Sequence, residues 1–140
     1  PHTFDAATDI DGHNRQPGCR DSCSAGRDSF LDNWQRAAGQ RIWVNPPFCM
    51  VGEFMDAVEA AWHLDERTTC TMVVPAWQQM DWYRRALKRI NPAWRVLDTI
   101  PGTVPLYVKA EAERKRERPG DAPYNAPPPG WDTLVLAFPA

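Results

Sequence analysis

The sequence predicts an α/β fold with three layers, in which helices cover both faces of a mostly parallel sheet that has an antiparallel C-terminal strand. Two β-type apolar runs, at 42–44 and 71–75, are separated by a segment with helical periodicity. A strand, a helix and a second strand within roughly 30 residues form a right-handed crossover with a parallel strand pair. A last apolar run, at 133–138, follows a long Pro-rich connection and is expected to insert antiparallel.

The composition is that of one globular domain that spans residues 1–140. Hydrophobic residues make up 43% of the chain and charged residues 24%, which suits a single modest core. No apolar run approaches the roughly 20 residues that a membrane span needs, and no signal peptide is visible, so we expect no membrane partner. The first residue is Pro1, as in a processed product or a part of a larger polypeptide or complex.

The formal net charge of −2 gives the chain no overall basic excess. Proteins that bind nucleic acid by themselves usually carry such an excess, because phosphate contacts dominate their affinity. Three interpretations are open: a local basic patch binds nucleic acid, a partner protein provides the contacts to nucleic acid, or nucleic acid is not the substrate.

The four cysteines favour free thiols in a reducing, intracellular compartment. Cys49 and Cys70 adjoin apolar segments and are expected to be small core residues. Cys19 and Cys23 lie in a polar segment, where His13 is the only nearby candidate for a further zinc ligand. These three residues are one fewer than the four ligands that a zinc ion needs. We therefore expect no metal.

The most informative stretch is the apolar run at 42–44, which ends in Asn45-Pro46-Pro47-Phe48. Proline cannot donate to a sheet ladder, so the strand is expected to stop at Asn45. Asn45 and Phe48 then project from the carboxyl end of a strand, where open α/β sheets bind their ligands.

This stretch suits the methylation of an exocyclic amino group on a planar ring. The Asn45 amide oxygen and the rigid Pro46 carbonyl can each accept one N–H of that group and so aim its lone pair. The Phe48 ring can stack on an extruded base. The alternative interpretation is a strand followed by a Pro-Pro turn and a core Phe.

Two segments are candidates for the cofactor site. A first strand that ends near Asp5 and Ala6 combines a carboxylate acceptor with small side chains that let the backbone approach a ligand. Asp28 and Phe30 could place a carboxylate and an apolar wall around an adenine ring. The alternatives are a surface turn rich in Asp and Asn, and a one-turn helix at 28–34 that buries its apolar residues. Residues 15–27 read as a loop.

Two helices follow from periodicity. Apolar residues at Val51, Phe54, Met55, Val58, Ala61 and Trp62 predict an amphipathic helix. A second helix, at 78–90, carries Arg84, Arg85 and Lys88 on a basic side, which is the best candidate for a surface that faces phosphate. The alternative is a solvated helix face. Trp77, just before this helix, is expected either to line the target pocket or to pack against a helix.

The C-terminal third is read as strands joined by polar connections. Residues 94–100 and 104–108 predict two strands around a Pro-Gly turn. Residues 109–130 form a charged and Pro-rich connector that precedes the last strand.

The chain as a whole resembles the phage-type DNA adenine-N6 methyltransferases, the Dam family, and the related domains of DIRS-type tyrosine-recombinase retrotransposons. The likeness runs nearly end to end, through Phe4–Ala7, Asp28–Leu31 with Trp34, Trp43–Phe48, Val73–Pro75, Trp82, Pro101-Gly102 and the last strand. It implies a Rossmann-like class I methyltransferase sheet and S-adenosylmethionine as cofactor. It also implies that Phe4, Asp5, Ala6, Asp28 and Phe30 lie at the cofactor, and Asn45, Pro46, Pro47 and Phe48 at the target base.

Three functions are compatible with these residues. The first is an enzyme that methylates adenine N6 in DNA with S-adenosylmethionine. The second is a catalytically inactive methyltransferase fold that serves as a scaffold or binding module in a larger nucleoprotein assembly. The third keeps the chemistry but changes the acceptor to RNA adenine or to a protein glutamine amide, because the same tetrapeptide suits those planar nitrogens.

Overall fold

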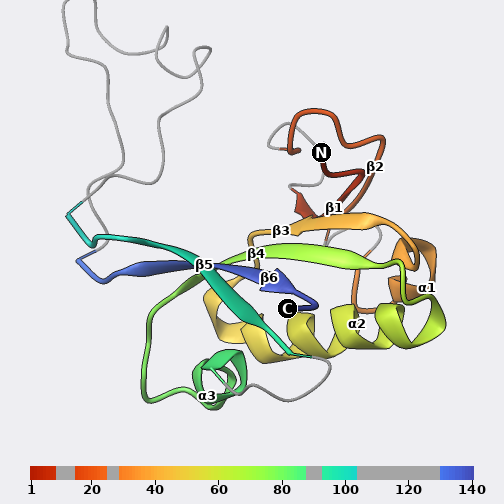
Figure 1. The fold of residues 1–140 in the computed structure, drawn as a ribbon. Helices are drawn as coiled ribbons and strands as arrows, with labels where there is room; N and C mark the ends of the chain where they lie inside the picture. The colour runs from red at the N-terminus through yellow and green to blue at the C-terminus, as the bar shows by residue number, and fades with distance from the viewer. Residues whose placement is uncertain (9–14, 25–28, 88–92, 104–129) are drawn as a thin grey trace, which may run out of the picture.

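The computed structural model describes residues 1–8, 15–24, 29–87, 93–103 and 130–140. Ten elements follow one another in this part of the chain (Figure 1). The strands are β1 (Phe4–Thr8), β2 (Asp21–Ser24), β3 (Arg41–Val44), β4 (Thr69–Pro75), β5 (Arg95–Ile100) and β6 (Thr133–Phe138). The helices are α1 (Trp34–Ala37), the 3-10 turn η1 (Phe48–Met50), α2 (Val51–Leu64) and α3 (Asp81–Leu87).

The strands form one six-stranded sheet in the order β2-β1-β3-β4-β6-β5. β1 pairs in parallel with β2 and β3, and β3 pairs in parallel with β4. β6 is antiparallel to both of its neighbours, β4 and β5. The prediction of an α/β fold with a mostly parallel sheet and an antiparallel C-terminal strand is therefore confirmed.

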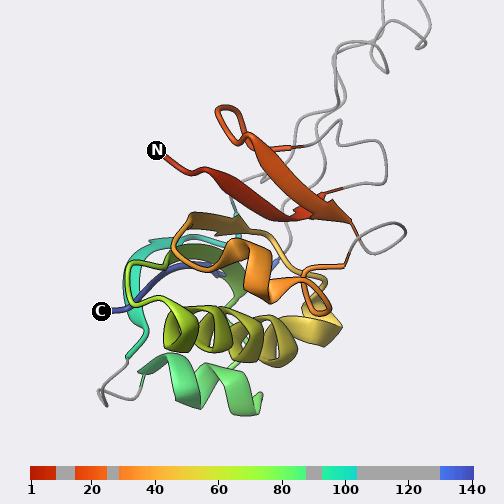
Figure 2. The same ribbon diagram turned by 90° about the vertical axis from the view of Figure 1, so that its right-hand side faces the viewer.

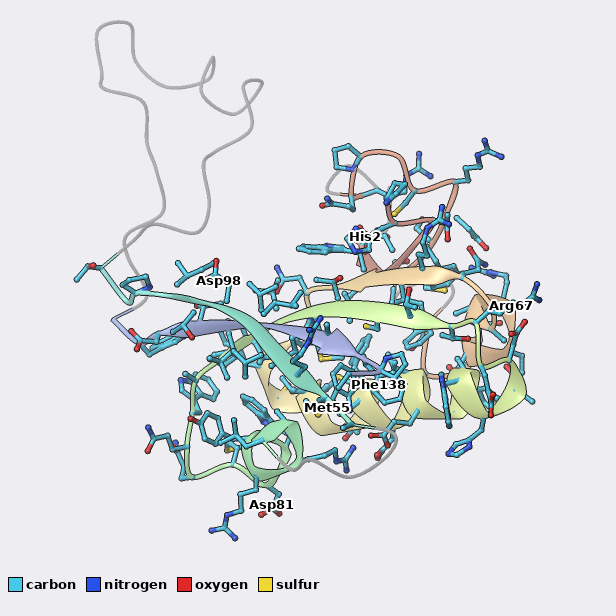
Figure 3. The ribbon with its side chains drawn as sticks, viewed as in Figure 1. His2, Met55, Arg67, Asp81, Asp98 and Phe138 are labelled. Carbon is cyan, nitrogen blue, oxygen red and sulfur yellow. The ribbon has the colours of Figure 1, made fainter. Side chains whose placement is uncertain are left out.

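The core lies between one face of this sheet and α2. Alternate residues of β4 are buried, namely Cys70, Met72 and Val74, as the two-residue period of a strand requires. Met55 of α2 and Phe138 of β6 are also almost fully buried and lie in the space between helix and sheet (Figure 3). The predicted amphipathic helix thus buries its apolar stripe apart from Trp62, which is partly exposed.

The expectation of three layers is wrong for the described part of the chain, which has two. α1, α2 and α3 lie on the same side of the sheet (Figures 1 and 2). His2 lies on the other side, opposite Met55 (Figure 3), where its Nε2 is 2.9 Å from the Thr71 hydroxyl oxygen. In the connection from β1 to β2, residues 15–20 form turns rather than a helix, so they add no helical layer to that side.

Several predicted boundaries change. The expected loop at 15–27 contains β2, whose sequence Asp-Ser-Cys-Ser has little strand propensity and is held by pairing with β1. The first strand continues beyond Asp5 to Thr8. The helix predicted at 78–90 is α3, which begins at Asp81 and is described as far as Leu87. The predicted strand at 104–108 and most of the 109–130 connector lie outside the described residues.

The cysteines of the described residues form no disulfide bond. Cys70 is buried as expected, but Cys49 is exposed because it lies on the outer side of η1. Cys19 and Cys23, expected in a polar loop, are both buried; Cys23 is part of β2 and Cys19 lies just before that strand.

Candidate functional site

A cavity of about 400 Å³ opens at the carboxyl ends of β1 and β3. This volume is within the range of small-molecule pockets. Because the two strands are parallel neighbours, the residues that follow them meet at the same edge of the sheet. The lining residues are Ala6, Ala7, Thr8, Ser29, Phe30, Asn45, Pro46, Pro47, Phe48, Met50 and Phe54.

All four residues of the Asn45–Phe48 tetrapeptide line this cavity. The β3 ladder ends at Val44, before the two prolines, as their missing N–H groups require. The Pro47 carbonyl then accepts the Met50 N–H at 2.9 Å, which starts η1 and leads directly into α2. Asn45 and Phe48 are half-buried and Pro46 is buried, and all three border the cavity.

The end of β1 forms the opposite wall with small side chains, Ala6, Ala7 and Thr8. The Thr8 hydroxyl donates to the Cys23 carbonyl of β2 at 3.1 Å, which holds this strand end in place. Phe30 and Phe54 supply an apolar wall, with ring centroids 6.0 Å apart and planes at 25°.

Two residues expected at the cofactor do not line the cavity. Phe4 is fully buried and packs against Phe30, with ring centroids 5.9 Å apart. Asp5 is also buried, and its carboxylate accepts the backbone N–H groups of Gln16 and Ala7. Asp5 directly precedes the lining residues of β1, but both of its carboxylate oxygens bind the chain's own backbone rather than facing the cavity. Asp28 lies outside the described residues.

Burial raises the pKa of the Asp5 carboxyl above its ordinary value, and the N–H donors of Gln16 and Ala7 oppose that shift. The Asp5 side chain accepts hydrogen bonds from the chain's own backbone around β1. It anchors the strand end that lines the cavity, without being part of the lining.

Phe48 is also part of a cluster of three rings, which we call the aromatic rim (Phe48, Trp77 and Trp131). The ring centroids of Phe48 and Trp77 are 5.3 Å apart, those of Phe48 and Trp131 are 6.0 Å apart, and those of the two tryptophans are 5.3 Å apart. All three contacts are edge-to-face, and all three residues are partly exposed. Trp77 thus lies next to a lining residue, but it does not itself line the cavity.

Trp131 was not identified from the sequence. Antiparallel pairing of Pro75 with Thr133 places the residues before β6 beside those after β4. The Asp132 carbonyl also accepts the Ala76 N–H at 2.7 Å. The signal that could have found Trp131 is an aromatic residue just before the predicted antiparallel strand, at the level of Trp77.

The basic residues predicted on the helix at 78–90, now α3, do not form one surface. The Arg85 guanidinium donates to Asp56 of α2 at 2.6 Å and lies 4.0 Å from Glu59, so it joins two helices rather than facing a phosphate. Arg84 is exposed, and Lys88 lies outside the described residues. The expected phosphate-facing surface is therefore reduced to Arg84 among the residues described.

The described residues contain no group of three or more His, Cys, Asp or Glu side chains that could hold a metal ion. In the same ranges, no helix has both the length and the apolar character to cross a bilayer.

The chain was compared with models of known protein families, with curated proteins and with solved structures, and none of these comparisons found a match.

Proposed function

We propose that this protein is an S-adenosylmethionine-dependent methyltransferase that acts on the exocyclic amino group of adenine in DNA. The observation that carries the proposal is the shared cavity. It brings the residues of the Asn45–Phe48 segment together with the small-residue end of β1. A group-transfer enzyme needs a donor and an acceptor in adjoining space.

The sheet supports the same proposal. A Rossmann-like methyltransferase sheet is mostly parallel, with a late antiparallel strand inserted beside earlier ones. Here β6 is inserted between β4 and β5, and its direction is opposite to both. The proposed site is at the carboxyl edge of the parallel strands, where folds of this kind bind ligands.

On the acceptor side, Asn45 and Pro46 position the amino group. The amide oxygen of Asn45 and the backbone carbonyl of Pro46 each accept one N–H bond, which reduces delocalisation of the nitrogen lone pair into the ring. Phe48 stacks on the base and keeps its plane aligned with these acceptors. The prolines hold the carbonyl still, so little reorganisation is needed when charge develops.

On the donor side, the lining fits the cofactor. The side chains of Ala6, Ala7 and Thr8 leave space next to the backbone, and Phe30 offers an apolar face for a planar ring. These residues would hold S-adenosylmethionine, which supplies an electrophilic methyl group on a sulfonium centre.

Methyl incorporation into DNA from tritiated S-adenosylmethionine tests the proposal. Asn45→Ala is expected to abolish incorporation, because one acceptor for the amine is lost, while its thermal unfolding stays close to that of the wild-type protein. Gln35→Ala, which changes an exposed residue of α1, is the matched control and is expected to retain activity. Activity of Asn45→Ala equal to that of the wild-type protein would end this mechanism.

One observation favours the second candidate, an inactive methyltransferase fold that acts as a scaffold in an intracellular nucleoprotein assembly, such as that of a retrotransposon. Asp5 binds its own backbone, and no carboxylate is among the described lining residues. Calorimetry with S-adenosylmethionine separates the two candidates. Micromolar binding supports the enzyme, and no binding at millimolar cofactor supports the scaffold.

A further inference from the structure

We infer that the acceptor of this site is single-stranded DNA, in which the target base is already unpaired. The inference rests on the proposed function and specifies its substrate class. It comes from the aromatic rim and from the charges of the described residues around it.

The aromatic rim extends the stacking surface beyond the cavity. Phe48 belongs to the lining, and Trp77 and Trp131 continue from it along the carboxyl edge of the sheet. The three rings come from separate segments, after β3, after β4 and before β6. Large apolar rings that stay partly exposed beside a pocket offer faces on which successive bases can stack.

The indole of Trp131 also carries a hydrogen-bond donor that a ligand could use. Its Nε1 is buried and has no hydrogen-bond partner in the part of the chain that the structure describes. A buried donor without an acceptor costs free energy. A ring nitrogen, a carbonyl or a phosphate oxygen of a bound strand can accept from this N–H after a small movement of the ring.

The charges argue against a duplex. A duplex acceptor requires extrusion of the target base, at a cost of a few kcal/mol, and duplex binding depends on phosphate contacts. None of the described lining residues is charged. Arg85 is held by Asp56 and Glu59, and the chain has a formal net charge of −2. Phosphate contacts contribute to the binding of single strands as well, but stacking on the aromatic rim requires bases that are free of pairing, which a single strand offers without the cost of extrusion.

Fluorescence anisotropy without cofactor tests this inference independently of catalysis. The probes are a labelled, adenine-containing DNA strand of about 12 nucleotides and the duplex of the same sequence. The single strand is expected to bind at least about tenfold more tightly than the duplex at the same salt concentration. Equal or tighter binding of the duplex would overturn the inference, and this comparison needs no variant.

Variants then test the aromatic rim. Trp77→Ala and Trp131→Ala are each expected to weaken single-strand binding by about tenfold to a hundredfold, because one stacking face is lost. Trp77→Phe and Trp131→Phe keep a flat face and should restore most of the affinity if the alanine variants fold poorly. Trp34→Ala, which changes a partly buried tryptophan of α1 outside the cavity, is the matched control.

Unchanged single-strand binding in both alanine variants would refute a stacking role for the rim. This failure is distinct from failure of the proposed function. A protein that binds the single strand through Trp77 and Trp131 but takes up no S-adenosylmethionine keeps the binding surface and loses only the methyl transfer.

Discussion

The carboxylate of Asp5 accepts the backbone N–H of Gln16 at an N–O distance of 2.6 Å. Its other oxygen accepts the N–H of Ala7 at 3.2 Å. One buried side chain thus joins the segment before β2 to the strand end that lines the cavity. A carboxylate that from sequence appeared to be a ligand for a cofactor has a structural role, which has consequences for stability.

The first prediction concerns the pH dependence of that stability. The folded-state pKa of Asp5 is raised above its ordinary value of 3.8, so the native state holds the proton more tightly than the unfolded state. Its stabilising contribution is complete below pH 3.8 and is lost as the pH rises through the raised pKa. In urea titrations, the unfolding free energy of the wild-type protein minus that of Asp5→Asn is expected to fall between pH 3.8 and neutral pH. A constant or rising difference would contradict this.

The second prediction concerns the donor side of the cavity. Ala7→Leu adds three carbon atoms to a lining position and is expected to weaken S-adenosylmethionine binding by more than about tenfold, because the added volume displaces the ligand. Calorimetry measures the loss. Ala137→Leu makes the same change at a partly exposed position of β6 outside the cavity and should leave the affinity unchanged. Equal effects of the two substitutions would show that Ala7 does not face the cofactor.

The third prediction separates two neighbouring arginines. Arg85→Ala removes a partly exposed ion pair with Asp56 and is expected to lower the unfolding free energy by about 0.2–1 kcal/mol. Arg84→Ala changes an exposed side chain and is expected to shift it by less than about 0.5 kcal/mol. If α3 contacts phosphate, the salt dependence of DNA binding should weaken in Arg84→Ala and stay unchanged in Arg85→Ala. The opposite pattern would return Arg85 to the phosphate-facing surface.

The fourth prediction concerns two glycines. A Cβ at Gly102 would lie 2.7–2.8 Å from the backbone of Trp131, which cannot move as a flexible side chain can. Gly102→Ala is therefore expected to lower the unfolding free energy by about 1–3 kcal/mol and to weaken single-strand DNA binding, because Trp131 is displaced. A Cβ at Gly52 of α2 would lie 3.9 Å from Trp82, so Gly52→Ala should be neutral or should stabilise the helix by up to about 1 kcal/mol. Thermal unfolding of both variants checks the contrast.

Much of the fold follows from local pattern. The run 42–44 ends before two prolines, so the strand end and the position of Asn45 depend on covalent geometry that any tertiary context must respect. The apolar period of α2 and the alternation of β4 are likewise properties of short segments. The tetrapeptide could be predicted to border one cavity because its four residues are contiguous.

Other features depend on contacts between distant segments. β2 has little strand propensity and forms by pairing with β1, and the number of layers depends on which connections contain helices. Trp131 joins the aromatic rim through the β4–β6 register, and Arg85 finds Asp56 because α3 packs against α2. By itself, the sequence determined most of the elements, β2 excepted, and the chemistry of their ends, since both follow from local backbone constraints. Only the tertiary structure decided which side chains meet at the cavity and which serve the fold, because those contacts join residues far apart in the chain.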